Sequence, residues 1–214
     1  MVIIGIAGGI ASGKSLVTSC FQHFGAKILD GDRVGHEVLT EPEVIAEIVD
    51  RWGSQVLSGG AIDRKQLALI VFAEGSEAAS ELQHLEQITH PRIGFRIKEQ
   101  LDATQRAGTC PAVVLDAPVM FKVGWDQFCD HIVFVEAPLE VRRRRARERG
   151  WEDGELERRE ALQVSVELKR ARSTDVIHNS GSKAETYRSA ARLWTQWGLP
   201  TPATLDAPEA LISD

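Results

Sequence analysis

The eight residues Gly8-Gly9-Ile10-Ala11-Ser12-Gly13-Lys14-Ser15 match the pattern G-x-x-x-x-G-K-[ST], and an apolar run over residues 2–7 precedes them. Glycines let the backbone turn so tightly that successive N–H groups point into one concavity, which the dipole of a following helix makes more positive. The pattern assigns Lys14 to the β- and γ-phosphates of a nucleotide and the Ser15 hydroxyl to Mg²⁺. A glycine-rich turn before an ordinary helix is the plainer alternative, but the strand, loop and helix context favours a phosphate-binding loop.

Composition predicts an ordinary globular protein. The chain has 214 residues, of which 43% are hydrophobic and 26% charged, enough for one sizeable core and a subdomain. No apolar stretch approaches the roughly 18 residues of a membrane span, and the N-terminal run lacks a basic leader, so the expected location is the cytoplasm. The net charge of −6 opposes general binding to nucleic acid or to an anionic membrane. Neither a disulfide framework nor a zinc site is expected from three widely spaced cysteines, Cys20, Cys110 and Cys129.

Short apolar runs alternate with helical patterns, which predicts a parallel sheet with helices on both faces. The expected strands are residues 2–7, 26–29, 112–115, 132–135 and 176–177. Between the second and third strands, four helical patterns are expected at residues 43–52, 64–73, 77–89 and 92–106. No single crossover needs that length, so we expect an inserted helical subdomain near the place where an acceptor substrate binds.

Residues 138–174 read as a second insertion, a lid of two helices joined around Gly150-Trp151-Glu152-Asp153-Gly154. Residues 142–172 carry eleven of the twenty-five basic residues. Since each helical step turns a side chain by about 100°, four consecutive arginines cannot all meet one ligand. The spacing places Arg142, Arg145 and Arg149 on one stripe that would lie over a triphosphate, while the arginines at 143, 144 and 147 face elsewhere. A solvated helix paired with its own acids is the alternative; an RNA-binding stripe is less favoured because no aromatic residues interleave.

Two acidic residues, Asp30 and Asp32, end the second expected strand. If the extended geometry persists, both carboxylates project to the same side, at the carboxyl edge of the sheet where ligands bind. We expect Asp32 to act as the base that orients an acceptor hydroxyl for phosphoryl transfer. The alternative is that Asp30 caps a helix beginning near Arg33 and that Asp32 belongs to a turn beside Gly31.

Four further positions have two interpretations each. Asp116 closes the third expected strand, where an acid holds Mg²⁺ directly or through water, or simply forms a turn. Lys122, in the same loop, is solvated or touches phosphate. His90-Pro91 lies between two helical patterns, where the proline biases His90 toward an extended shape, and is structural or a substrate contact. Asn179-Ser180-Gly181 is a turn signal that would also border an adenine ring.

The order of these motifs resembles that of the dephospho-CoA kinase family up to about residue 197. Asp30-Gly31-Asp32 with His36 is similar to the family's Asp-Ala-Asp stretch, and His90-Pro91 to its His-Pro signature. Because many enzymes share the phosphate loop, the combination of Asp-x-Asp, His-Pro and lid arginines is the more specific signal. The remaining matches are Ile62-Asp63-Arg64 with Leu67 and Phe72, Leu85-Glu86, Ile93, Asp116-Ala117-Pro118 with Phe121, the arginines at 142, 145 and 149, Arg159 with Gln163, and Ile177, Asn179 and Gly181.

The resemblance implies transfer of the γ-phosphoryl of ATP to the ribose 3′-hydroxyl of dephospho-CoA, with Mg²⁺, giving CoA and ADP in the last step of coenzyme A biosynthesis. Catalytic roles fall to Asp32, Lys14 and Arg145, and the metal ligand is Ser15. The implied ATP-binding residues are Gly9, Ala11, Ser12, Gly13, Lys14, Ser15, Leu16, Arg142, Arg149 and Asn179. The implied acceptor-binding residues are Asp32, His36, Arg64, His90 and Asp116.

The resemblance also implies a three-layer α/β P-loop NTPase fold with a parallel sheet, a helical acceptor-binding insertion and a helical lid. The expected divisions are a nucleotide-binding core (1–35, 108–137 and 175–197), a CoA-substrate subdomain (36–107), the lid (138–174) and a flexible tail (198–214). The expected partner is the small-molecule substrate alone, with no nucleic acid and no membrane, in a monomer or weak homo-oligomer.

Several residues depart from the family pattern. Lys122 replaces a usual Glu and reverses the charge beside the expected acceptor site, and Ser173-Thr174 replaces a usual Ala-Asp. The milder departures are Ala11 for Gly, Leu16 for Thr, Gly31 for Ala and Arg142 for Gln. Two other functions stay open: a kinase for another small-molecule hydroxyl, and a nucleotide-dependent switch, which the lack of an Asn-Lys-x-Asp signature disfavours.

Overall fold

The computed structural model describes residues 1–73, 76–202, 204 and 207–212. Contacts between residues divide the chain into two compact units, and the long helix α5 (Ser76–Ala107) runs from one into the other. The first unit is Met1–Leu29 with Ala103–Asp214, and it holds the phosphate loop and the arginine-rich segment. The second unit is Asp30–Asp102. No helix of the described ranges combines the length and apolar character needed to cross a bilayer.

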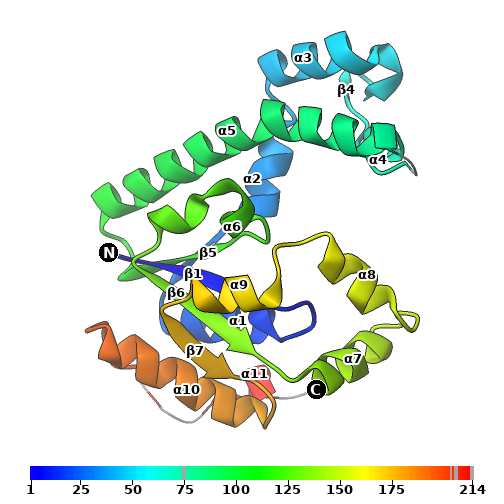
Figure 1. Ribbon diagram of the computed structural model, residues 1–214. Coiled ribbons are helices and arrows are strands. Elements are labelled where there is room, and N and C mark those ends of the chain that lie inside the picture. Colours follow the sequence, from blue (N-terminus) through cyan, green and yellow to red (C-terminus); the bar gives the residue numbers. More distant parts are fainter. Residues whose placement is uncertain (74–75, 203, 205–206, 213–214) are drawn as a thin grey trace. The chain divides into compact units, whose positions relative to one another are not determined.

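The first unit is built on a five-stranded sheet in the order β2-β5-β1-β6-β7 (Figure 1). The central strand β1 pairs in parallel with β5 and β6, and β6 with β7. The strands are β1 (Val2–Gly8), β2 (Lys27–Asp30), β5 (Ala112–Asp116), β6 (His131–Glu136) and β7 (Asp175–His178). Every bound lies within one residue of its expected position, so the predicted parallel sheet is confirmed. Since parallel strands end at a common edge, this order brings the residues that follow β1, β5, β6 and β7 together.

Helices pack on the sheet through one apolar core. The helices of this unit are α1 (Lys14–His23), α6 (Met120–Val123), α7 (Leu139–Glu148), α8 (Glu155–Ala161), α9 (Val166–Ala171), α10 (Lys183–Gln196) and α11 (Glu209–Ile212), with a 3₁₀ turn, η2 (Trp125–Phe128). α1 lies against α10, and Phe21 stacks on the fully buried Trp194 with ring centroids 6.1 Å apart. α9 lies against β1 (Figure 1). The core therefore fixes α1, and with it the end of the phosphate loop.

The arginine-rich segment, residues 138–174, contains three helices, not the two expected. Gly154, with φ +81°, is the residue that precedes α8. The Ser165 hydroxyl accepts a hydrogen bond from the Leu168 N–H and starts α9. Such a serine cap begins a new helix, which is why one expected helix became two.

The described part of the tail is packed, in contrast to the loose tail expected for residues 198–214. Leu199 is buried, and the Trp194 Nε1–H donates to the Pro200 carbonyl at 2.7 Å. The Tyr187 hydroxyl donates to the Thr204 carbonyl at 3.2 Å. Buried aromatic donors need partners, and these carbonyls supply them. Residues 203, 205–206 and 213–214, which the same prediction covered, lie outside the described residues.

The second unit is mainly helical. Its elements are α2 (Gly31–Val38), α3 (Pro42–Trp52), a 3₁₀ turn η1 (Ser54–Val56), the antiparallel strands β3 (Leu57–Ser58) and β4 (Ala61–Ile62), α4 (Arg64–Val71) and most of α5. The predicted helices at 43–52 and 64–73 are confirmed with small shifts of their ends. The short β3–β4 hairpin was not predicted.

The expected helices at 77–89 and 92–106 form one continuous helix, α5, so the prediction of an extended His90 is wrong. Pro91 lies inside it and cannot donate its own backbone hydrogen bond. The Arg92 guanidinium donates to the Ile88 carbonyl at 2.6 Å, one turn back. Ile88 and Ile93, on either side of the proline, are both buried. Packing on both sides therefore outweighs the break that the proline favours.

Candidate active site

Backbone geometry explains the glycines of the phosphate loop. Gly8 has φ +149° and Gly13 has φ +95°. A Cβ on Gly8 would lie 2.7 Å from both the Ser12 Oγ and the Val135 carbonyl oxygen, and a Cβ on Gly13 would collide with the Asn179 side-chain amide. Neither position accepts a side chain without displacing its neighbours, so the tight loop requires glycine there.

Ala11 also adopts a left-handed conformation, with φ +59°. That conformation costs an alanine about 1 kcal/mol relative to glycine. Ala11 is buried in a small apolar cluster with Ala146 of α7 and Leu156 of α8, and Ile10 and Trp151 pack against it. This packing attaches the tip of the loop to the arginine-rich segment.

The carbonyl groups of the loop are held by cationic and amide side chains. Lys14 Nζ donates to the Gly9 carbonyl at 3.0 Å and to the Gly8 carbonyl at 3.3 Å. Arg145 donates to the Ser12 and Asn179 carbonyls, both at 2.9 Å. The Asn179 side-chain amide also donates to the Ser12 carbonyl, at 2.7 Å. These bonds engage the acceptors of the loop, so an anion would meet its N–H donors.

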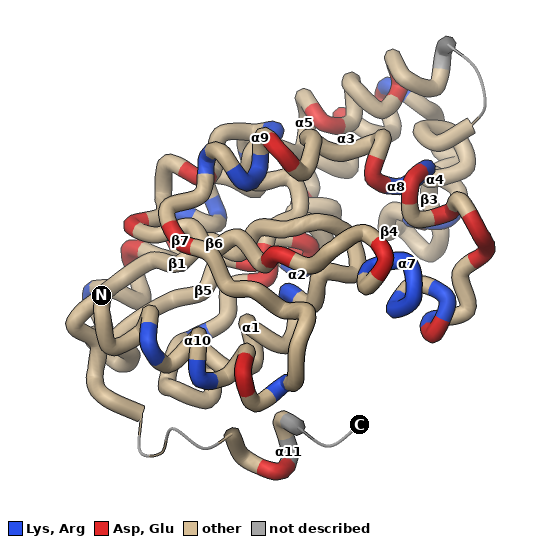
Figure 2. Tube along the Cα trace, turned by 60° about the horizontal axis from the view of Figure 1, so that its bottom comes forward, with Lys and Arg blue, Asp and Glu red and all other residues tan. Residues whose placement is uncertain are grey.

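The arginines of α7 divide into two groups. Arg142 and Arg145 lie against the loop, as the predicted stripe requires, whereas Arg149 is exposed. The others pair with acids of their own segment, and Figure 2 shows basic and acidic positions interleaved along α7. These pairs are Arg143 with Glu140 and Glu157, Arg144 with Glu148, and Arg147 with Asp153. The expectation that they face elsewhere is confirmed.

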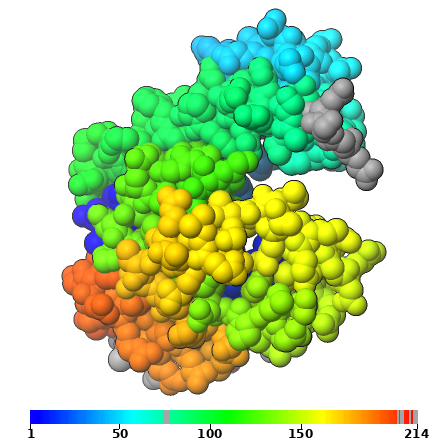
Figure 3. Space-filling view, in the orientation of Figure 1, coloured from blue at the N-terminus to red at the C-terminus, as the bar shows by residue number. Residues whose placement is uncertain are grey.

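A carboxylate of α8 reaches the phosphate loop. Glu160 Oε1 accepts hydrogen bonds from the Ile10 N–H at 2.8 Å and from Arg142 Nη1 at 2.6 Å. In Figure 3, atoms of α7 to α9 (yellow-green and yellow) cover most of the blue N-terminal segment behind them, which is visible only through narrow gaps. No sequence pattern indicates Glu160, because one glutamate among many acids of this segment carries no distinguishing signal.

The ammonium group of Lys14 lies in a strongly charged environment. Burial, and then the positive charges of Lys169 and Arg149, lower the pKa of Lys14 to about 8. The negative charges of Asp116 and Glu160 oppose that shift. Asp116, at the end of β5, therefore acts electrostatically on the phosphate loop, as its position in the sheet order predicts.

The residues present fit a magnesium ion held mainly by substrate. The Ser15 side chain, in the first turn of α1, is exposed. Among residues 1–73, 76–202, 204 and 207–212, no three or more His, Cys, Asp or Glu side chains form a group that would hold a metal. Mg²⁺ is commonly bound by one or two protein ligands together with phosphates and water. Ser15 would supply such a ligand, and the carboxylate of Asp116 acts on the neighbouring Lys14. Within the described ranges, the buried Ser12 hydroxyl has no hydrogen-bond partner, as expected of a group that bonds a ligand.

The second unit contains Asp32. Strand β2 ends at Asp30, whose carboxylate accepts from the Asp32 N–H at 2.9 Å and the Arg33 N–H at 3.1 Å, and α2 begins at Gly31. The expectation of two carboxylates on the same side of an extended strand is therefore wrong, and Asp30 is the helix cap of the alternative interpretation. Partial burial and then the charge of Asp30 raise the pKa of Asp32, which His36 opposes.

Two expected acceptor-binding residues meet in this unit. Arg64 Nη1 and His36 Nε2 are hydrogen-bonded, although they are 28 residues apart in sequence. The neighbouring Asp63 caps α4 by accepting from the Lys65 and Gln66 N–H groups. His90, in α5, is partly buried.

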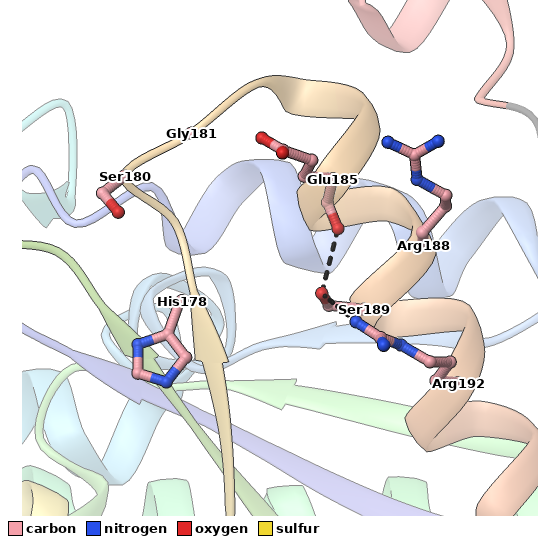
Figure 4. A pocket seen from close by; sticks show the side chains of 7 residues that line it. All are labelled: His178, Ser180, Gly181, Glu185, Arg188, Ser189 and Arg192. Carbon is pink, nitrogen blue, oxygen red and sulfur yellow. Dashed lines mark hydrogen bonds between the residues drawn. The ribbon is translucent and has the colours of Figure 1, made fainter.

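A surface pocket of about 560 Å³ borders the turn that follows β7 (Figure 4). His178, Ser180 and Gly181 line one side, and residues of α10 line the other. Ser189 Oγ donates to the Glu185 carbonyl at 2.9 Å across the helix surface. The turn itself is anchored by Asn179, whose side-chain oxygen accepts from the buried Thr186 hydroxyl at 2.8 Å.

The model of one family, the dephospho-CoA kinases, matches residues 2–185 of this chain. The chain belongs to the dephospho-CoA kinase family. The dephospho-CoA kinase of Deinococcus radiodurans is 38% identical over 179 residues, 83% of this chain and 84% of that protein. That of Geobacter metallireducens is 38% identical over 199 residues, 92% of this chain and 96% of that protein.

Solved structures agree on the fold. A Thermus thermophilus protein aligns with a TM-score of 0.74 at 33% identity, over 92% of this chain and 97% of that one. A dephospho-CoA kinase from Campylobacter jejuni aligns with a TM-score of 0.61 at 21% identity, over 91% and 96%. The predicted P-loop kinase fold is therefore confirmed for this member of the dephospho-CoA kinase family.

Replacing Glu160 with glutamine is expected to tighten ATP binding and to lower the melting temperature. The carboxylate neutralises Arg142 and acts on Lys14, so removing its charge leaves the loop more attractive to a polyphosphate. A hydrogen bond to a charged group contributes about 1.5–3 kcal/mol, and the folded state loses part of that. Calorimetric titration with ATP and thermal unfolding measure the two effects. Glu157→Gln, on the same helix and paired with the more exposed Arg143, is the matched control; equal ATP affinities of the two variants would contradict the prediction.

Proposed function

We propose that this protein transfers the γ-phosphoryl group of ATP to the ribose 3′-hydroxyl of dephospho-CoA, giving CoA and ADP. The family match over residues 2–185 carries this conclusion. The complete phosphate loop, with its glycine-dependent turn and its lysine, supports the assignment of ATP as the donor.

At the donor side, the N–H groups of the loop and the N-terminus of α1 bind the phosphates. Lys14 exchanges its bonds to the Gly8 and Gly9 carbonyls for the β- and γ-phosphates, and Arg145 adds a second positive charge beside the loop. When bound, Mg²⁺ supplies further neutralisation of phosphate charge, and the Ser15 hydroxyl would hold it. The adenine base is assigned to the Asn179 turn, which borders the pocket of Figure 4.

At the acceptor side, Asp32 takes the proton of the ribose 3′-hydroxyl as its oxygen bonds to phosphorus and the bond to the ADP oxygen breaks. The raised pKa of Asp32 supports this role, because it makes the carboxylate a stronger base. The hydrogen-bonded pair of His36 and Arg64 is assigned to acceptor binding, as are His90 and Asp116.

The division into core, acceptor subdomain and lid belongs to the same proposal, as do a cytoplasmic location and a monomer or weak homo-oligomer. The positive charge of Lys122, where the resemblance implies a Glu, is expected to change the affinity for the acceptor. A lysine there favours an anionic part of the acceptor.

An ADP-release assay tests the proposal with ATP and Mg²⁺ in three arms: dephospho-CoA, adenosine and no acceptor. We expect ADP only with dephospho-CoA, together with a product heavier by one phosphoryl group by mass spectrometry. Release of ADP without an acceptor would indicate a nucleotide-dependent switch. Turnover of adenosine alone would indicate a kinase for another hydroxyl.

A further inference from the structure

A small cavity of about 80 Å³ lies at the carboxyl ends of β1 and β5. Most of its lining is apolar and comes from residues 6–8, 117–118 and 120–121. Three polar side chains also line it: Lys14, Gln163 and Lys169. The first belongs to the phosphate loop, and the other two come from the arginine-rich segment, residues 138–174.

Lys169 is buried to an unusual degree for a lysine, with 5% of its surface exposed. Its Nζ donates to the Gln163 side-chain oxygen at 2.7 Å, a neutral acceptor. The carboxylate whose charge acts on this ammonium group, Glu160, is paired with Arg142 at 2.6 Å. A buried ammonium without a direct counter-ion is costly, so its retention calls for a ligand.

The two lysines repel each other. Burial lowers the pKa of Lys169, Glu160 opposes the shift and Arg142 adds to it. Lys169 in turn is the second cause of the lowered pKa of Lys14. Two ammonium groups that share one small cavity need an anion with more than one negative charge to offset their repulsion. A phosphoryl group meets that requirement.

The lining of the cavity indicates which phosphate it receives. It includes Gly8 and Lys14 but none of residues 9–13, whose backbone lies at the tip of the loop. Loop amides bind the α- and β-phosphates, whereas the loop lysine reaches the β- and γ-phosphates. The cavity therefore lies at the lysine end of the loop, where the transferred group is bound.

We propose that Lys169 is a second cation that contacts the transferred γ-phosphoryl group, with Gln163 as the positioning residue that holds its ammonium group. This inference rests on the proposed kinase activity of the same site. Lys169 stays in contact with the phosphoryl group during its transfer from ADP to the acceptor oxygen. Its positive charge offsets the negative charge on the equatorial oxygens of that group.

The test compares ATP with ADP, because only ATP carries the γ-phosphate. Lys169→Met removes the charge and keeps the length of the side chain. We expect it to weaken ATP binding about tenfold or more, to leave ADP binding within about twofold, and to lower kcat by about 10²-fold. Calorimetry without any acceptor gives both affinities, and steady-state assays give kcat and KM. Lys169→Arg is expected to recover part of the ATP affinity, since it restores the charge.

Arg170→Met, the next residue on α9, is the matched control because Arg170 is exposed, with a long pair to Glu136 at 3.6 Å and its guanidinium 5.8 Å from the centre of the Phe134 ring. We expect it to bind ATP and ADP like the unaltered protein. If Lys169→Met does not fold, Lys169→Gln makes the same charge change with a side chain that still bonds water.

Three outcomes would overturn the inference. Equal losses of ATP and ADP affinity would place Lys169 on the α- or β-phosphate. Unchanged ATP affinity and kcat would make it a purely structural residue, and a change in the KM for dephospho-CoA alone would place it on the acceptor. The calorimetric titrations contain no acceptor, so they test the role of Lys169 even if the protein does not phosphorylate dephospho-CoA. Failure to phosphorylate dephospho-CoA would instead contradict the proposed function.

Discussion

Replacing Lys14 with alanine is expected to lower kcat/KM for ATP by about 10³-fold or more, the scale of losing a preorganised charge in a water-poor site. Lys14 is the loop cation whose ammonium group lies on the Gly8 and Gly9 carbonyls and faces the cavity shared with Lys169. The two hydrogen bonds and the shared cavity place this ammonium group where the loop would bind phosphate. Initial rates of ADP release at several ATP concentrations measure the effect.

The stability of the Lys14→Ala variant separates a catalytic loss from a folding defect. Burial already lowers the pKa of Lys14, so removing this ammonium group also removes an unfavourable buried charge. We therefore expect the melting temperature to stay close to that of the unaltered protein. Lys98→Ala, which removes an exposed lysine paired with Asp102, is the control for loss of one positive charge. A Lys14→Ala variant with nearly full rate would contradict the assignment of the loop.

Replacing Asp32 with asparagine is expected to lower kcat by about 10²-fold or more while ATP affinity stays unchanged. Asparagine keeps the shape of the side chain but cannot accept the proton of the acceptor hydroxyl. Asp32 lies in the first turn of α2, and among the described residues the helix cap is supplied by the carboxylate of Asp30, not by that of Asp32. The substitution therefore removes a base without removing the cap of the helix.

The neighbouring Asp30→Asn supplies the matched control. Asparagine caps helices about as well as aspartate, so α2 should persist and kcat should remain within a few-fold of normal. The charge of Asp30 raises the pKa of Asp32, so its removal lowers that pKa. Because Asp32 must be deprotonated to act as a base, the acidic limb of the rate profile should move to lower pH. Loss of activity in Asp30→Asn together with full activity in Asp32→Asn would contradict the prediction and would make Asp30, not Asp32, the base.

Local patterns predicted most of the secondary structure. The five parallel strands and the helices α1, α3 and α4 depend on apolar periodicity and on turn residues within a few positions of each other. The Asp30 cap depends on equally local chemistry, yet the extended geometry expected for Asp32 was wrong because the strand stops one residue before Gly31. Element ends are where a single cap changes the direction of a side chain.

Other features depended on packing. Pro91 has a strong local preference for ending a helix, but the buried Ile88 and Ile93 keep α5 continuous. The division of the arginines of α7 was predicted from helical rotation alone. What each group contacts was not, because Arg145 bonds to Ser12, which is 133 residues away in sequence.

By itself, the sequence determined the phosphate loop, the parallel sheet and the family, because these are written in short motifs and in their order along the chain. Only the tertiary structure decided that Glu160 bonds the Ile10 N–H across 150 residues and that Lys169 shares a cavity with Lys14. The physical reason is that the sheet order brings distant strand ends to one edge, where burial changes the energy of each charge. A glutamate or a lysine has no such property until the chain around it has folded.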